Sequence, residues 1–259
     1  MTTTQPIDDH TRQLLVDLAG RYETAAFLEG DPSWWMHQCT GDADREAVAF
    51  VAQALSYGSR PQFMKKIGLL FDLCGGAMHR WVLEGAYAQV LRPGDSSPFY
   101  RLYSNGAMNA FLGAYRQLLA EHGSLGAYVA RHGDGTAMRA LALTTSWFSA
   151  HGDGRVVPGG TVSACKRLCM FLRWMARDGS PVDLGLWSGF VDRRSLIMPL
   201  DTHVLTEAAR LGLCHGRTAS MGAALRLTAT VAGVFPDDPL RADFALFGYG
   251  VQREKQVGL

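Results

Sequence analysis

The chain contains few cysteines, no excess of charge and no long apolar run. Its five cysteines are scattered through 259 residues and odd in number, which argues against a disulfide framework. Lysine and arginine total 25 and the acids total 24, so a nucleic-acid binder would need a local basic surface. No stretch reaches the roughly 18 uninterrupted apolar residues of a membrane span. The first ten residues lack the basic and apolar regions of a signal peptide. We therefore expect a cytoplasmic protein that has no membrane contact.

Fixed-period repeats, low-complexity stretches and convincing alternation of apolar and polar residues are also missing. Apolar residues make up 47% of the chain and recur at helical spacing, as Val48, Val51, Ala52 and Leu55 do after an acidic start. The same pattern, interrupted by short Gly, Pro, Asp and Ser connections, predicts helices at 44–55, 61–73, 76–91, 106–121, 124–132, 135–150, 162–177, 183–190, 201–211, 219–234 and 238–246. The sequence therefore predicts an all-α globule.

The segment from Lys166 to His203 contains the residues best suited to chemistry. A glycine-rich connection, 151–165, leads into a helix that begins near Lys166, with Thr161 or Ser163 as the expected cap. A lysine in such an apolar helix is either a surface residue with a buried stem or a partly desolvated, nucleophilic amine. By residue statistics alone the surface interpretation is the stronger one.

Asp201 precedes a helical run and is predicted to cap it. Capping and catalysis are compatible, because a carboxylate fixed by helix N–H groups stays rigid and could stabilise a positive transition state. His203, two residues on, is either a general base or a structural side chain. By residue statistics Asp201 is an ordinary helix cap and His203 a structural histidine.

Two groups of basic residues are compatible with phosphate contacts or with solvated helix faces. The first comprises Arg167, Arg173, Arg177, Arg193, Arg194 and His203, and the second comprises Arg60, Lys65 and Lys66. Cys165 and Cys169 have a spacing that two metal ligands can use, but no further ligand follows nearby. We expect both to be core residues, and we expect no metal.

Several sequence blocks resemble the bacterial DUF2400 family, over about residues 28–251. These blocks are Leu55-Ser56-Tyr57-Gly58-Ser59-Arg60, Phe99-Tyr100-Arg101-Leu102, Gly123-Ser124-Leu125, Cys165 through Met175, Val182 through Trp187, Pro199-Leu200-Asp201-Thr202-His203-Val204, and Asp238-Pro239 through Gly248. The lysine helix and the Pro-x-Asp-x-x-Val turn are in turn similar to the helix-hairpin-helix DNA glycosylase superfamily. The archaeal 8-oxoguanine glycosylase branch is the most similar, because there too the lysine precedes the aspartate by a long gap, 35 positions here.

Two motifs of that superfamily are missing from the chain. A Leu-Pro-Gly-Val-Gly-type hairpin is absent, and Pro158-Gly159-Gly160 is the nearest approach to it. The Cys-x6-Cys-x2-Cys-x5-Cys pattern of the iron–sulfur branch is absent too, so we expect no cluster and no other cofactor.

The resemblance implies a single glycosylase-like unit over 1–259, made of two helical lobes with the active site in the cleft between them. It implies a monomeric base-excision repair glycosylase and AP lyase that removes an oxidised purine, 8-oxoguanine above all, from damaged double-stranded DNA. Lys166 would attack the anomeric carbon and form a Schiff base, and Asp201 would stabilise the developing positive charge and help deprotonate the lysine.

Four further residues are weaker candidates for substrate binding. Asp243 and Phe247 stand at the spacing of an aspartate and an aromatic that hold the base in the archaeal branch; otherwise they would be a helix cap and a core side chain. His203 and Arg60 are candidates for phosphate or pocket contacts. Two other functions stay open: a DNA-structure binding protein without catalysis, and an N-glycosidase of a small nucleoside or nucleotide.

Overall fold

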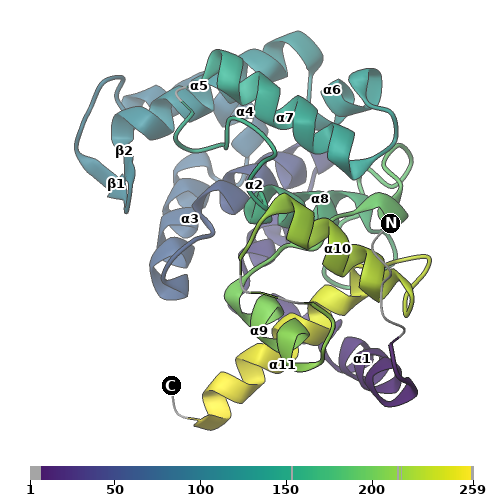
Figure 1. The fold of residues 1–259 in the computed structure, drawn as a ribbon. Coiled ribbons are helices and arrows are strands. Elements are labelled where there is room, and N and C mark those ends of the chain that lie inside the picture. The colour runs from purple at the N-terminus through teal and green to yellow at the C-terminus, as the bar shows by residue number, and fades with distance from the viewer. Residues whose placement is uncertain (1–6, 153, 215, 217, 258–259) are drawn as a thin grey trace. The chain divides into compact units, whose positions relative to one another are not determined.

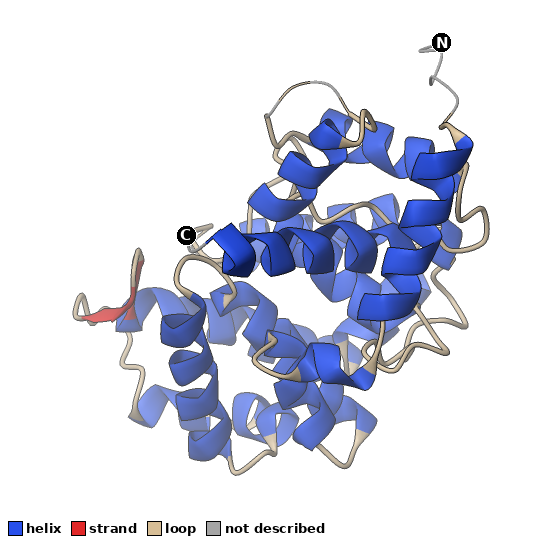
Figure 2. Ribbon diagram, turned by 90° about the horizontal axis from the view of Figure 1, so that it is seen from below, coloured by secondary structure: helices blue, strands red, loops and turns tan. Residues whose placement is uncertain are grey.

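The structure is a computed structural model that describes residues 7–152, 154–214, 216 and 218–257. Helices dominate these residues, and their strands are limited to the antiparallel pair β1 (Pro98–Tyr100) and β2 (Tyr103–Ser104) (Figure 2). The prediction of an all-α fold is therefore confirmed. None of the described helices is both long and apolar enough to span a bilayer.

The chain divides into two compact units. Unit 1 comprises residues 1–27, 136–138 and 162–259, and unit 2 comprises residues 28–135 and 139–161. Unit 1 holds α1 (Asp9–Tyr22), α8 (Lys166–Ala176), the 3₁₀ turn η4 (Arg193–Ser195), α9 (Thr202–Arg210), α10 (Met221–Ala232) and α11 (Arg241–Val257). Unit 2 holds η2 (Pro32–Gln38), α2 (Asp42–Leu55), α3 (Arg60–Cys74), α4 (Met78–Leu83), η3 (Ala86–Gln89), the two strands, α5 (Asn105–His122), α6 (Leu125–His132) and most of α7 (Ala137–His151), while η1 (Ala25–Leu28) ends at the boundary.

Unit 2 is organised around α2, whose residues from Glu46 to Leu55 are all buried. Phe50 packs against Phe111, Tyr115 and Phe148, with ring centroids 4.9–5.6 Å apart. The buried Glu46 carboxylate accepts hydrogen bonds from the first two backbone N–H groups of α6, at 2.8 and 3.0 Å. A buried carboxylate thereby satisfies donors that a helix start would otherwise leave unpaired.

In unit 1, α11 packs against both α1 and α9 (Figure 1). The amphipathic α1 is not among the helices predicted from the sequence, although Asp8 caps it by accepting a hydrogen bond from the Thr11 N–H at 2.8 Å. The first turns of α11 lie in the interior of the unit, because residues 242–246 are all buried.

The expected helix at 183–190 is wrong, and its residues form turns instead. Gly185 adopts a left-handed φ of 66°, and the N–H groups of Leu184, Gly185 and Trp187 donate to the carbonyls of Trp174 and Met175. The segment therefore satisfies the last carbonyls of α8, which no helical N–H can reach.

Candidate functional site

Lys166 is the first residue of α8, which begins four residues later than the predicted 162–177 helix. The N-cap is Cys165, not Thr161 or Ser163, and it makes no side-chain cap hydrogen bond. Cys165 has a left-handed φ of 44°, a strained conformation for a residue with a side chain. The residues before it are tied to the start of α10, through a bridge between Ser163 and Ser220. The backbone that presents Lys166 is thus sharply turned and anchored.

Asp201 caps α9, as predicted. Its Oδ1 accepts a hydrogen bond from the Val204 N–H at 2.8 Å, and its backbone carbonyl accepts one from the Leu205 N–H. The preceding stretch, residues 196–200, is buried throughout. The carboxylate is therefore held in one orientation by the helix start behind it.

The amine and the carboxylate meet within unit 1. Lys166 Nζ lies 3.6 Å from Asp201 Oδ2, the oxygen that the cap hydrogen bond leaves available. The Lys166 side chain is 40% exposed, whereas that of Asp201 is 10% exposed. The arrangement combines an accessible amine with a fixed, mostly buried carboxylate, which suits an attacking group and a charge stabiliser.

Two further basic residues follow Lys166 on the same side of α8 and its C-cap. Arg173 and Arg177 follow Lys166 by seven and eleven positions, and these spacings return to nearly the same side of a helix. Both arginines are buried, with 3% and 2% exposure. They are neither phosphate contacts nor part of a solvated face, so the expectation for these two members of the basic group is wrong.

Carboxylates from three other segments neutralise the buried arginines. Arg173 pairs with Asp183 at 3.2 Å and with Asp243. Arg177 pairs with Asp183, with Asp238 at 2.7 Å and with Glu23 at 2.6 Å. We call this set, Glu23, Arg173, Arg177, Asp183, Asp238 and Asp243, the arginine network. Of its carboxylates, only Asp243 was predicted as a site residue. The feature of the sequence that could have indicated the network is the presence of Arg173 and Arg177 on an otherwise apolar helical segment.

Asp243 lies in the first turns of α11 and is a member of the network, with its Oδ2 bound by Arg173. Burial, with a smaller contribution from the charge of Asp201, raises the pKa of Asp243 to about 6 against the lowering effect of Arg173. The structure thus brings Asp243 close enough to Asp201 for their charges to interact. A carboxyl with a pKa near 6 exchanges protons readily near neutral pH.

Phe247 lies one turn beyond Asp243 and is half-buried. Its ring packs edge-on against His203, with centroids 5.5 Å apart and an interplanar angle of 87°, and lies 5.8 Å from the ring of Phe27. His203 Nδ1 is also 3.7 Å from Glu254 Oε1. Lys166, Asp201, His203, Asp243 and Phe247 therefore all belong to unit 1, whereas Arg60 is the first residue of α3 in unit 2.

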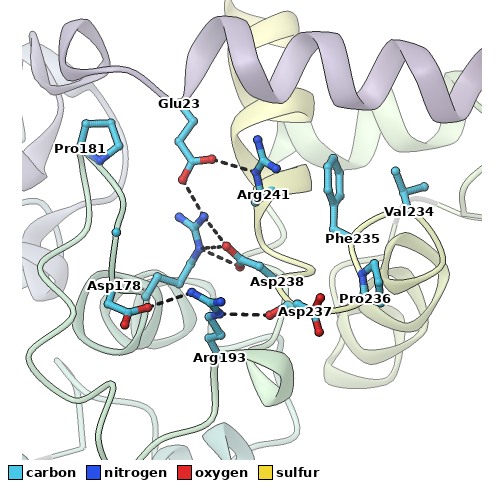
Figure 3. A pocket seen from close by; sticks show the side chains of 12 residues that line it. Glu23, Asp178, Pro181, Arg193, Val234, Phe235, Pro236, Asp237, Asp238 and Arg241 are labelled. Carbon is cyan, nitrogen blue, oxygen red and sulfur yellow. Dashed lines mark hydrogen bonds and ion pairs between the residues drawn. The ribbon is translucent and has the colours of Figure 1, made fainter.

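An open pocket of about 590 Å³ lies at the C-terminal end of α8 (Figure 3). Arg177, Arg193 and Arg241 line it together with Glu23, Asp178, Asp237 and Asp238, and Phe235 and two prolines form its apolar part. Arg193 pairs with Asp178 at 2.8 Å and Arg241 with Glu23 at 3.2 Å, so these charges are matched within the pocket. Lys166 and Asp201 are not part of its lining, and we do not assign the substrate to it.

Cys165 and Cys169 are both buried, as expected of core residues. Cys169 is buried, its thiol contacts the Ala164 carbonyl at 3.4 Å, and burial raises its pKa well above the usual value. Over the described part of the chain, no group of three or more His, Cys, Asp or Glu side chains could hold a metal ion.

Comparison with known proteins gives one family. No curated protein and no solved structure matches the chain. The family described as "Protein of unknown function (DUF2400)" matches residues 31–252, a span that includes α8, Asp201 and Asp243. The chain therefore belongs to the DUF2400 family.

Proposed function

We propose that this protein is a DNA glycosylase with AP lyase activity that excises an oxidised purine, 8-oxoguanine above all, from duplex DNA. The observation that carries the proposal is the 3.6 Å approach of Lys166 Nζ to Asp201 Oδ2. The resemblance of the lysine helix and the Pro-x-Asp-x-x-Val turn to helix-hairpin-helix DNA glycosylases, in particular the archaeal 8-oxoguanine branch, supplies the substrate class. The two residues lie far apart in the chain, and a binding protein has no need to bring them together.

The proposed reaction begins with proton transfer from Lys166 to the Asp201 carboxylate, which leaves a neutral amine. The amine nitrogen attacks C1′ of the damaged nucleotide as the bond from C1′ to the base breaks. The base departs with that electron pair and takes up the proton held by Asp201, which restores the carboxylate. The positive charge that develops on the sugar faces the carboxylate of Asp201.

The covalent adduct then opens. The bond between C1′ and the ring oxygen breaks, that oxygen takes up a proton from the lysine nitrogen to become the 4′-hydroxyl, and the nitrogen forms a double bond to C1′, which is the Schiff base. Loss of a C2′ proton expels the 3′ phosphate, and water releases Lys166 from the aldehyde product. The arginine network supports this chemistry by fixing α8 and α11, which present Lys166 and Asp243.

The exposure of the amine favours a large substrate over a small one. With 40% of its side chain exposed, Lys166 is open to a polymer that approaches from solvent. An N-glycosidase of free nucleosides would be expected to enclose its nucleophile in a small pocket.

Borohydride trapping on a duplex with a single 8-oxoguanine tests the proposal directly. Reduction of the Schiff base converts it into a stable amine, so the wild-type chain should form a covalent adduct with DNA. The chain has only four lysines, Lys65, Lys66, Lys166 and Lys255, so peptide mapping can assign the adduct to one position.

Two variants complete the test. Lys166→Gln should abolish the adduct, whereas Lys65→Gln, which alters an exposed lysine of α3, should retain it. An adduct that persists in Lys166→Gln would assign the chemistry elsewhere. Intact duplex binding with no base release across a panel of damaged bases would refute the glycosylase proposal in favour of a non-catalytic DNA-binding protein.

A further inference from the structure

The β1–β2 hairpin of unit 2 presents the side chain of Leu102 to solvent at its turn. Its strands are joined by Arg101 and Leu102, and Leu102 is 83% exposed. The other large side chains of the hairpin, those of Phe99, Tyr100 and Tyr103, are buried at 7%, 5% and 4% exposure. Figures 1 and 2 both show the hairpin extending beyond the start of α5. The hairpin therefore buries its own aromatic side chains and leaves Leu102 at its tip.

Tyr57 holds the tip of the hairpin in place. Its hydroxyl accepts a hydrogen bond from the Leu102 N–H at 3.4 Å and donates one to the Tyr100 carbonyl at 3.4 Å. The Tyr100 hydroxyl donates in return to the Tyr57 carbonyl, and both Tyr100 and Tyr103 have ring centroids 5.2 Å from that of Tyr57. This reciprocal bonding makes the tip a supported turn rather than a loose one.

The other turn residue, Arg101, is also constrained. Its φ of 49° lies in the left-handed region, which a residue with a side chain adopts at a cost. Its guanidinium lies over the Tyr57 ring, 5.7 Å from the centroid, and its side chain passes over Gly58, where an added Cβ would be only 2.7 Å from a guanidinium nitrogen. The absence of a side chain at Gly58 therefore leaves the space that the Arg101 side chain occupies.

A second cation lies against the hairpin. Lys66 Nζ is 4.8 Å from the centre of the Phe99 ring, so α3 contributes a positive charge to the same region. The basic group predicted from Arg60, Lys65 and Lys66 thus begins next to the hairpin, since Arg60 follows Gly58 by two positions. An isolated apolar tip among cations does not resemble a protein-binding face, whose centre is apolar and poor in charge.

We propose that Leu102 inserts between base pairs of duplex DNA while Arg101 and Lys66 contact the flanking phosphates. Proteins that kink or open a duplex use apolar side chains as wedges between base steps, and their cations bind the phosphates on either side. An enzyme that acts on an extruded base must also unstack it. The choice of DNA as partner rests on the proposed function; the wedge itself rests on the hairpin.

Fluorescence of 2-aminopurine placed beside 8-oxoguanine in a duplex tests the wedge without catalysis, because unstacking raises the emission of this base. The measurement uses the full chain carrying Lys166→Gln, so that no turnover occurs. Binding should raise the fluorescence, and adding Leu102→Ala should remove most of the rise. Leu83→Ala is the matched control, since it shortens an exposed leucine at the end of α4 and should leave the rise unchanged.

Base release by the otherwise wild-type chain provides a second measurement. Leu102→Ala should slow release from a paired lesion about 10- to 100-fold, the order expected from losing help with unstacking. It should alter release from the same lesion in an unpaired bubble less than about 2-fold. A circular dichroism spectrum and melting temperature equal to wild type would show that the variant is folded.

The outcomes separate the wedge from the glycosylase proposal. If Lys166-dependent trapping is observed but Leu102→Ala retains the fluorescence rise and the rate on paired DNA, the wedge is refuted and the enzyme stands. If trapping fails but DNA binding raises fluorescence in a Leu102-dependent way, the wedge stands and the chemistry is refuted. If the wild-type chain binds no duplex DNA at all, both are refuted.

Discussion

We expect Asp183→Asn to be among the most destabilising single substitutions in unit 1. The Asp183 side chain is completely buried and accepts hydrogen bonds from the buried Arg173 of α8 and from Arg177, the C-cap residue of that helix. Asparagine keeps the volume but removes the charge, which leaves two buried cations short of one carboxylate. Breaking a buried ion pair by removing one partner costs about 3–5 kcal/mol.

The raised pKa of Asp183 indicates which end of this range of stability loss to expect. Burial raises the pKa of Asp183, although Arg173 and Arg177 act to lower it, so the ionised carboxylate is itself costly to bury. Asparagine removes part of that cost, and we therefore expect a loss near the lower end, about 3 kcal/mol. For a chain of this size that corresponds to a fall in melting temperature of about 6–12 °C.

Urea unfolding followed by tryptophan fluorescence measures the effect, because Trp174 and Trp187 are fully buried beside the network. Asp178→Asn is the matched control: it removes a carboxylate that is 61% exposed and paired with Arg193, and it should change stability by less than about 1 kcal/mol. If the two variants are equally stable, the arginine network does not hold unit 1 together and the reasoning fails.

Two further predictions concern Asp201 and Asp243. Asp201→Asn should lower base release by several orders of magnitude while DNA affinity stays nearly unchanged, because asparagine still caps α9 but carries no charge; a large loss of affinity in a binding titration would instead make Asp201 a structural cap. Asp243, with its pKa raised to about 6 by burial, binds a proton more readily when folded than when unfolded. Its ionisation therefore costs stability as pH rises from about 4 to about 6, and wild type should gain stability relative to Asp243→Asn, by about 1–3 kcal/mol, between pH 7 and pH 4. Urea midpoints of both proteins across that range would contradict this if their difference stayed constant.

The helices could be predicted wherever apolar periodicity is bounded by Gly, Ser or Pro, as in α2, α3 and α5. The prediction failed where a tertiary contact overrides a local pattern. Residues 183–190 have a helical apolar spacing, but the N–H groups of Leu184, Gly185 and Trp187 bind the end of α8, and the rest of the segment forms turns. The expected helix at 76–91 is split into α4 and η3 because Gly85 adopts a left-handed φ of 77°.

The candidate site could be predicted only in part. The proximity of Lys166 and Asp201 followed from resemblance, because nothing local relates two helix starts 35 positions apart. The arginine network could not be predicted, since Arg177 finds partners 61 and 154 positions away. A helix that carries two arginines on a mostly apolar surface gives the same pattern whether its cations face solvent or buried carboxylates, and only the tertiary fold decides between them.

The arginine network and the Lys166–Asp201 pair differ in how much they contribute to stability, and this difference bears on whether the protein is an enzyme. The buried network stabilises the fold, so variants within it confound activity with folding. The Lys166–Asp201 pair is different: Lys166 is 40% exposed and the gap is 3.6 Å, and exposed pairs of this kind contribute about 1 kcal/mol or less. A folded protein gains little from keeping this lysine beside a fixed carboxylate on an anchored turn. Lys166→Gln should therefore leave the melting temperature nearly unchanged while it abolishes chemistry, and a large loss of stability would make the pair structural after all.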